Sequence, residues 1–136
     1  MSSDAGVLYV AIGQNALDAV AMSTEALRLH NGYPYVFLTE ACLDHAPRTD
    51  WTRKQQSRWL KTRLSAFSPY NLTIYLDADT RPFGCLEPLL QALRDGWDMA
   101  ICPSRHQGDG KNPPTPGRVL RLARVSDIHH SRYPRK

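Results

Sequence analysis

The sequence predicts an α/β fold of the Rossmann-like type, with a mainly parallel sheet between two layers of helices (three layers, α/β/α). Three short apolar runs, at residues 7–13, 35–39 and 73–76, have the length and composition of buried strands. The stretches between them carry apolar residues at helical spacing. A strand–helix–strand order of this kind is typical of parallel strands joined by right-handed crossovers.

The first strand–helix–strand unit has clear boundaries in the sequence. The run over residues 7–13 ends in a glycine, and we expect Asn15 to cap a helix over residues 16–30. Asn31 and Gly32 tolerate the left-handed conformation that ends many helices. The glycine turn matches neither G-x-G-x-x-G nor G-x-x-x-x-G-K-[ST]. The sequence therefore indicates neither a dinucleotide fingerprint nor a P-loop.

The second crossover is predicted to be a single helix. Thr52 and Gln55 have the spacing of a capping box, and apolar residues recur at helical spacing as far as Phe67. After the third strand, the pattern predicts a short helix over residues 86–94 and a further strand over residues 98–102. The sheet is therefore expected to contain at least four strands, with the third of them in a central position.

Charge is distributed unevenly along the 136 residues, whose net charge is +4. Residues 1–104 contain 9 Lys/Arg and 11 Asp/Glu, a net charge of −2, whereas residues 105–136 contain 8 and 2, a net charge of +6. The second segment is also rich in proline and glycine at its start. We therefore predict one α/β domain over residues 1–104, followed by a Pro/Gly-rich loop and a basic tail over residues 105–136.

Several features predict a cytoplasmic protein without a membrane span. No apolar run approaches the roughly 18 residues that a membrane helix needs. The N-terminus has neither the basic nor the apolar region of a signal peptide. Cys42, Cys85 and Cys102 are odd in number and form no C-x-x-C pair, so we expect thiols in a reducing compartment.

The most informative polar motif is the pair Asp77 and Asp79, which directly follows the third predicted strand. Residues two positions apart in a strand point to the same side, so the two carboxylates are expected to converge. Like charges that converge favour a cation between them, and an all-oxygen pair suits a hard ion such as Mn²⁺ or Mg²⁺. A solvated acidic turn without a ligand is the alternative for an isolated D-x-D motif.

The location of this pair suggests a diphosphate as its partner. Ligands of open parallel sheets bind beyond the carboxyl ends of the strands, where Asp77, Asp79 and the first glycine turn are all expected. Lys61, Arg63 and Arg105 are cations that could neutralise phosphate groups there. The chemistry that fits is the departure of a nucleoside diphosphate from a sugar, with a metal stabilising the leaving oxygens. No catalytic residue can be assigned.

These features resemble the nucleotide-diphospho-sugar transferases of the GT-A fold. The similarity lies in residues 7–13, residues 36–39, Lys61 and above all the Ile-Tyr-Leu-Asp-Ala-Asp-Thr sequence at residues 74–80. Within that fold, the chain is most similar to glycosyltransferase family 8, the glycogenin-like and lipopolysaccharide galactosyltransferase-like enzymes. The resemblance covers about residues 6–104.

The resemblance implies a role for each matching residue. Asp77 would contact the donor ribose and the metal, and Asp79 would bind the metal and the diphosphate. Three residues of the first turn would lie along the nucleoside, namely Ala11, Gly13 and Asn15. Lys61 or Arg63 would approach the base or the phosphates. The implied donor is a nucleoside-diphosphate sugar, most simply a UDP-sugar, and the acceptor is not identified.

Members of that family usually extend well beyond this length. They carry an acceptor-binding half and a C-terminal histidine motif that completes the metal site, and His129 and His130 do not match that motif in context. We therefore expect a chain truncated at its C-terminus relative to such enzymes, with residues 105–136 as the start of the missing half. Activity of the chain alone is an open question for the same reason.

Two other function classes fit parts of the sequence. A non-catalytic module could bind nucleic acid or an acidic surface through the basic tail, but Tyr133 is the one aromatic residue there that could stack on bases, so nucleic acid is not the favoured partner. A haloacid-dehalogenase-like phosphatase requires Thr or Val four residues after the first Asp, where this sequence has Arg81. Self-association into a homo-oligomer is compatible with the sequence.

Overall fold

The computed structural model describes residues 4–101 and 121–123. The chain divides into two compact units, residues 1–87 and residues 88–136. The boundary that the sequence predicts at residue 104 lies outside the described residues. Among those residues, no helix is both long and apolar enough to cross a bilayer.

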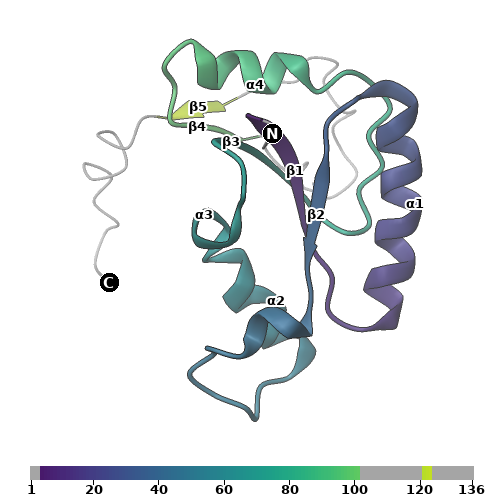
Figure 1. The fold of residues 1–136 in the computed structure, drawn as a ribbon, viewed down its shortest axis with the longest axis vertical. Coiled ribbons are helices and arrows are strands. Elements are labelled where there is room, and N and C mark those ends of the chain that lie inside the picture. The colour runs from purple at the N-terminus through teal and green to yellow at the C-terminus, as the bar shows by residue number, and fades with distance from the viewer. Residues whose placement is uncertain (1–3, 102–120, 124–136) are drawn as a thin grey trace, which may run out of the picture. The chain divides into compact units, whose positions relative to one another are not determined.

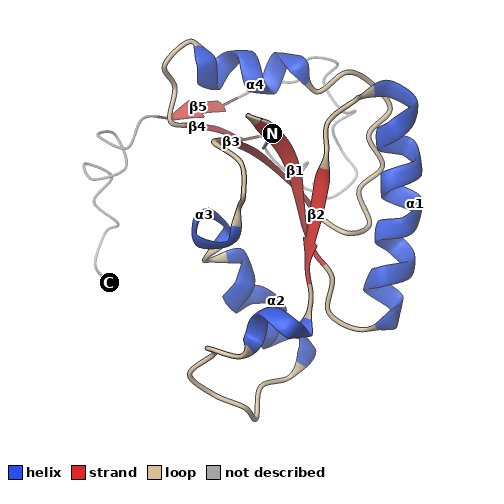
Figure 2. Ribbon diagram, in the orientation of Figure 1, coloured by secondary structure: helices blue, strands red, loops and turns tan. Residues whose placement is uncertain are grey.

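The first unit is built on a small parallel sheet (Figures 1 and 2). Its strands are β1 (Ala5–Val10), β2 (Tyr35–Leu38) and β3 (Leu72–Leu76), in the order β2-β1-β3. β1 pairs in parallel with β2 from Val7↔Tyr35 onward, and with β3 from Ala5↔Leu72 onward. The predicted α/β class and the parallel pairing of these three strands are confirmed.

The central strand is β1, and this corrects one expectation. All six residues of β1 are buried, as an unbroken apolar run predicts for a strand covered on both faces. β3 was expected to be central, but in the described sheet it pairs only with β1. Its residues are accordingly less enclosed, since only Ile74 of β3 is buried.

Helix α1 (Gln14–His30) packs on one face of β1. Its buried residues recur at helical spacing, and they are Val20, Ser23, Thr24 and Leu27. The Tyr9 hydroxyl of β1 and the buried Ser23 hydroxyl form a hydrogen bond of 2.9 Å, so these two polar groups satisfy each other. Burial raises the pKa of Tyr9 above its ordinary value.

Helices α2 (Arg53–Lys61) and α3 (Leu64–Phe67) follow β2 and lead to β3, and Figure 1 shows them across the sheet from α1. Leu60 of α2 is fully buried in a cluster with Leu8, Val10, Ile12 and Leu38. Trp59, Leu64 and Phe67 pack against that cluster, as the apolar spacing predicted. Residues that alternate along β1 therefore contact helices from different crossovers.

The second crossover contains two helices instead of the one predicted. The capping box is confirmed, since Gln55 N–H donates to the Thr52 hydroxyl and Thr52 N–H donates to the Gln55 side chain. The helix ends at Lys61 because the Thr62 hydroxyl donates to the Trp59 carbonyl at 2.7 Å and its backbone N–H is shared between two carbonyls. Threonine bonds of this kind compete with regular helical hydrogen bonding.

Helix α1 begins earlier than predicted. Its N-cap is Gly13, with φ 86° and ψ 165°, and no side chain caps the helix, so the prediction of Asn15 as the cap was wrong. This backbone conformation is accessible almost only to glycine, and the first helical residue follows it directly. β1 also ends at Val10, although Ala11 N–H still bonds the Leu38 carbonyl at 2.8 Å.

The remaining elements are short. A 3₁₀ helix, η1 (Glu40–Leu43), follows β2. In the second unit, α4 (Glu87–Arg94) begins at the boundary, and β4 (Met99–Ile101) pairs antiparallel with β5 (Arg121–Ala123). β5 was not predicted, because the tail has few apolar residues. Arg105, the Pro/Gly-rich loop, His129, His130 and Tyr133 lie outside the described residues.

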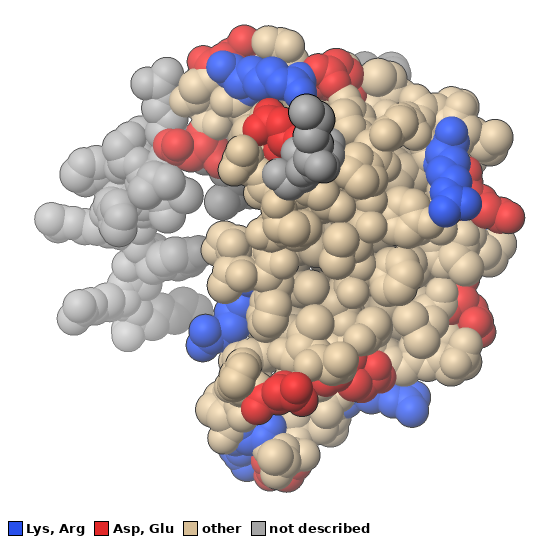
Figure 3. All heavy atoms as spheres, viewed as in Figure 1, with Lys and Arg blue, Asp and Glu red and all other residues tan. Residues whose placement is uncertain are grey.

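In the view of Figure 3, uncharged residues dominate the surface over β2. Val36 and Phe37 of this strand are 36% and 42% exposed. Apolar residues on an edge strand are a surface through which sheets can pair with other chains. The compatibility of the chain with a homo-oligomer stays a prediction.

Candidate functional site

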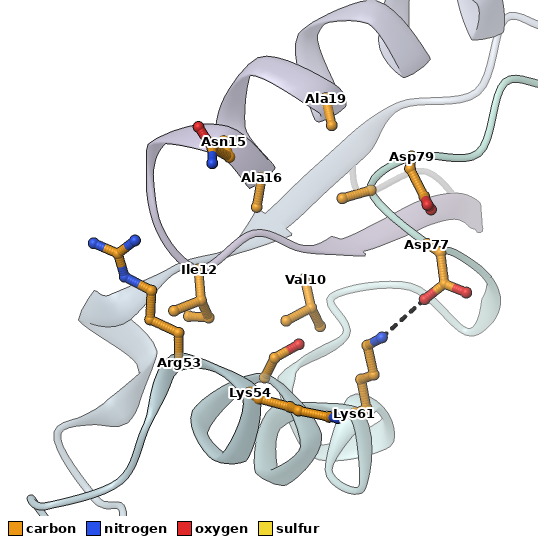
Figure 4. A pocket seen from close by; sticks show the side chains of 12 residues that line it. Val10, Ile12, Asn15, Ala16, Ala19, Arg53, Lys54, Lys61, Asp77 and Asp79 are labelled. Carbon is orange, nitrogen blue, oxygen red and sulfur yellow. Dashed lines mark hydrogen bonds and ion pairs between the residues drawn. The ribbon is translucent and has the colours of Figure 1, made fainter.

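An open cleft of about 420 Å³ lies at the carboxyl ends of β1 and β3 (Figure 4). Four segments form it: the end of β1 with the residues after it, the start of α1, one side of α2, and the turn after β3. The lining residues are Val10, Ile12, Asn15, Ala16, Ala19, Arg53, Lys54, Ser57, Lys61, Asp77, Ala78 and Asp79. The cleft is therefore where a parallel sheet is expected to bind a ligand.

The turn after β3 brings both aspartates to this cleft. Backbone hydrogen bonding closes the turn, because Thr80 N–H donates to the Asp77 carbonyl at 2.9 Å. Both aspartate side chains are exposed, and both line the cleft together with Ala78. Both aspartates thus line one cleft, and the binding of one metal ion by their carboxylates stays a prediction.

Asp77 is held by two donors on a single oxygen. Lys61 Nζ lies 2.9 Å from Asp77 Oδ1, and the Tyr75 hydroxyl donates to the same oxygen at 2.7 Å. The Lys61 hydrogen bond, with the Tyr75 bond second, holds the pKa of Asp77 below its ordinary value and outweighs the opposing effect of burial. Asp77 is therefore ionised throughout the physiological range.

Tyr75 acts only as a donor toward Asp77. Burial raises its pKa far above the ordinary value, and the hydrogen bond to Asp77 and the charges of both aspartates add to that effect. The Lys61 ammonium also lies 5.8 Å from the centre of the Tyr75 ring, within the range of a cation–π contact. Lys61, Tyr75 and Asp77 thus form one compact group at the end of the cleft.

Helix α2 supplies a row of polar side chains, of which only Lys61 was predicted as a site residue. Arg53, Ser57 and Lys61 are spaced four residues apart, so they share one side of the helix, and Lys54 lines the cleft beside them. The spacing was visible in the sequence, but each cation by itself reads as a solvated surface residue. In the view of Figure 4, Lys61 lies at the aspartate end and Arg53 at the end near Asn15.

The turn between β1 and α1 is fixed by a carboxylate from elsewhere in the chain. Gly13 N–H donates to Glu40 Oε1 at 2.7 Å, and this contact spans 27 residues. Arg53 covers the other side of the glycine, since a Cβ placed at Gly13 would lie 3.2 Å from its guanidinium carbon. The backbone of this turn is therefore occupied by the protein's own groups.

The structure brings some of the predicted site residues together and leaves others apart. Asn15, Lys61, Asp77 and Asp79 line the same cleft. Ala11 and Gly13 are buried in the adjoining turn without lining the cleft.

Arg63 is likewise not among the lining residues. Its guanidinium stacks on the Trp59 ring at 4.8 Å from the ring centre. The break between α2 and α3 explains this placement, because Arg63 follows the end of the helix that carries the cationic row.

The carboxylates of the cleft fit a metal ion whose remaining ligands come from a substrate and water. Within the described part of the chain, no group of three or more His, Cys, Asp or Glu side chains is arranged to hold a metal by itself. Asp77 and Asp79 offer carboxylate oxygens only, the ligand type that Mg²⁺ and Mn²⁺ prefer. Mg²⁺ is commonly bound by one or two carboxylates together with substrate phosphates and water.

Comparisons with known proteins identify no relative of this chain. No family model matches the chain, and neither a curated protein nor a solved structure is significantly similar to it. The residues of the cleft are therefore the basis for assigning a function.

Proposed function

We propose that this chain is the donor-binding part of a metal-dependent glycosyltransferase of the GT-A-like type. It would bind a nucleoside-diphosphate sugar, most simply a UDP-sugar, with Mn²⁺ or Mg²⁺ held by Asp77 and Asp79, and the sugar would pass to an acceptor. The small parallel sheet would then be part of a Rossmann-like three-layer core. The observation that carries the proposal is that the D-x-D turn opens into a cleft that also contains three cationic side chains.

The charges of the cleft suit a diphosphate bound with a divalent cation. Arg53, Lys54 and Lys61 line the same cleft as Asp77 and Asp79, which gives three positive and two negative side chains. A bound divalent cation would supply Lewis-acid stabilisation of the leaving diphosphate oxygens. The arginine and lysines of α2 would orient the phosphates through charge-assisted hydrogen bonds.

The apolar part of the lining suits the nucleoside end of such a donor. Val10, Ile12, Ala16 and Ala19 provide small and aliphatic contacts, and Asn15 adds an amide that can both donate and accept. Pockets for small molecules commonly combine an apolar lining with a few polar groups that fix orientation. Ala11 and Gly13 would act in this proposal by shaping the turn behind that lining.

The test is nucleotide binding to the full chain with and without metal. We expect UDP and UDP-sugars to raise the melting temperature in the presence of Mn²⁺, because a ligand that binds only the folded state stabilises it. Asp79→Asn should remove this Mn²⁺-dependent shift and leave the melting temperature of the free protein nearly unchanged.

Asp44→Asn is the matched control, since Asp44 is an exposed carboxylate that does not line the cleft. This variant should bind like the unsubstituted protein. Nucleotide binding that is independent of Mn²⁺ and unaffected by Asp79→Asn would contradict the proposal.

A further inference from the structure

Asp77 lines the cleft, and one of its carboxylate oxygens has a cationic partner within the protein. Lys61 Nζ contacts Asp77 Oδ1 at 2.9 Å (Figure 4). The Tyr75 hydroxyl donates to the same oxygen at 2.7 Å. A divalent cation held by Asp77 and Asp79 would have to share this carboxylate with the ammonium group. Two cations close together on one carboxylate repel each other, so both cannot keep their best positions.

We propose that Lys61 is a resident counter-ion of Asp77 that exchanges places with the divalent cation when the nucleoside diphosphate binds. This inference rests on the proposed function and assigns Lys61 a role in coupling the two ligands. Without a ligand, Lys61 neutralises Asp77. With metal on the aspartates, the ammonium moves from the carboxylate to the phosphate oxygens in the same cleft.

The position of Lys61 allows this movement. It is the last residue of α2, and its side chain is 41% exposed, while that of Asp77 is 56% exposed. An ion pair this exposed contributes little to stability, so breaking it costs little. A lysine carries its charge on a flexible four-carbon stem, which lets the ammonium reach a new partner without movement of the helix.

The exchange makes the two ligands cooperative. Metal alone must displace Lys61 and leave the ammonium without a carboxylate partner. When the diphosphate is present, its oxygens accept the displaced ammonium, so each ligand favours the other. Coupling between binding sites is reciprocal, and the same factor must appear whichever ligand is added first.

The experiment measures Mn²⁺ binding by the full chain, by electron paramagnetic resonance of free Mn²⁺, with and without UDP, together with UDP binding at saturating Mn²⁺. For Lys61→Met we expect Mn²⁺ alone to bind about two- to fivefold more tightly, the factor that an exposed ion pair represents. UDP at saturating Mn²⁺ should bind about tenfold more weakly, because a charge-assisted hydrogen bond to phosphate is lost. The coupling between the two ligands should fall accordingly.

Two control variants separate charge from pairing. Lys61→Arg keeps a cation beside Asp77 and should retain the coupling of the original protein. Lys54→Met removes an equal charge from the same cleft without removing the partner of Asp77. It should leave the affinity for Mn²⁺ alone unchanged within about twofold, because solvent and salt screen more distant charges.

The outcomes distinguish this inference from the proposed function. If Lys61→Met weakens UDP binding but leaves binding of Mn²⁺ alone unchanged, Lys61 is only a phosphate contact and the exchange is overturned, while the donor site stands. If Lys54→Met tightens Mn²⁺ binding as much as Lys61→Met, the effect is one of net charge and the exchange is also overturned. If the unsubstituted protein binds neither Mn²⁺ nor UDP, both proposals fail.

Discussion

The two turns at the carboxyl edge of the sheet use their polar groups in opposite ways. In the turn after β1, the Gly13 N–H is bonded to Glu40 and the glycine is covered by Arg53. In the turn after β3, the side chains of Asp77 and Asp79 are exposed in the cleft. The turn after β1 thus has its polar groups bound within the protein, whereas the turn after β3 exposes its aspartates to a ligand.

The difference shows that location alone does not make a binding group. Both turns are at the edge where parallel sheets bind ligands. A backbone N–H at such a turn could bind phosphate, yet here an internal carboxylate occupies it. We therefore expect substitutions in the first turn to affect mainly stability, and substitutions in the second to affect mainly binding.

The largest expected effect on stability is from Gly13→Ala. A side chain at φ 86° and ψ 165° is strained, and its Cβ would lie 3.2 Å from the Arg53 guanidinium. Strain of this kind costs up to about 3 kcal/mol, which chemical denaturation would measure as a lower free energy of unfolding. Gly32→Ala is the control, because a Cβ there meets nothing within 4 Å. Equal losses in the free energy of unfolding in the two variants would contradict a mainly stabilising role of the turn after β1.

A smaller effect is expected from Glu40→Ala. The substitution removes the acceptor of the Gly13 N–H in a part-buried contact, which should lower the free energy of unfolding by about 1 kcal/mol. Glu40→Gln retains an amide oxygen that can accept this hydrogen bond and should recover most of the loss. If the glutamine variant is as unstable as the alanine variant, the charge of Glu40, and not its hydrogen bond, stabilises the turn.

The three strands and their parallel order could be predicted from the sequence, because unbroken apolar runs such as residues 7–13 have few alternatives in a folded chain. The buried side of α1 followed from helical spacing in the same way. The end of α2 at Thr62 could not be predicted, since it depends on the Thr62 hydroxyl donating to the Trp59 carbonyl instead of to water. The start of α1 was missed because Gly13 adopts a conformation that no neighbouring residue indicates.

The site was predicted only in part, for a related reason. Asp77 and Asp79 could be placed because strand ends converge at one edge of a sheet, but the ion pair between Lys61 and Asp77 was not predicted. The contribution of Arg53, Lys54 and Ser57 depends on how α2 is rotated against the sheet, which Leu60 fixes by packing into the core. The bond between Glu40 and Gly13 joins residues far apart in the sequence, and no local pattern indicates it.

The smallest expected effect concerns the titration of Asp77, in the turn after β3. A carboxyl whose pKa is lowered in the folded state stabilises the fold above its ordinary value of 3.8, and this contribution is lost as the pH falls through the lowered pKa. Lys61→Met removes the largest cause of the lowering, so carbon-13 NMR should find the pKa of Asp77 closer to 3.8.

Asp50 is an internal control for that titration. The guanidinium of Arg48 lowers the pKa of Asp50, so Lys61→Met should leave the Asp50 titration unchanged. A pKa of Asp77 that does not respond to Lys61→Met would mean that the ion pair has no effect in solution.

The pairing of β1 with β3 also has a consequence for the order of events during synthesis. Ala5 pairs with Leu72, and the Asp4 carboxylate accepts a hydrogen bond from Asn71, a contact that spans 67 residues. Of the three described strands of this sheet, β1 is synthesised first, and its second edge is paired only once β3 has been synthesised. Contacts this distant in sequence form slowly. The acidic turn follows β3 directly, so its position beside the end of β1 depends on this pairing of β3 with β1.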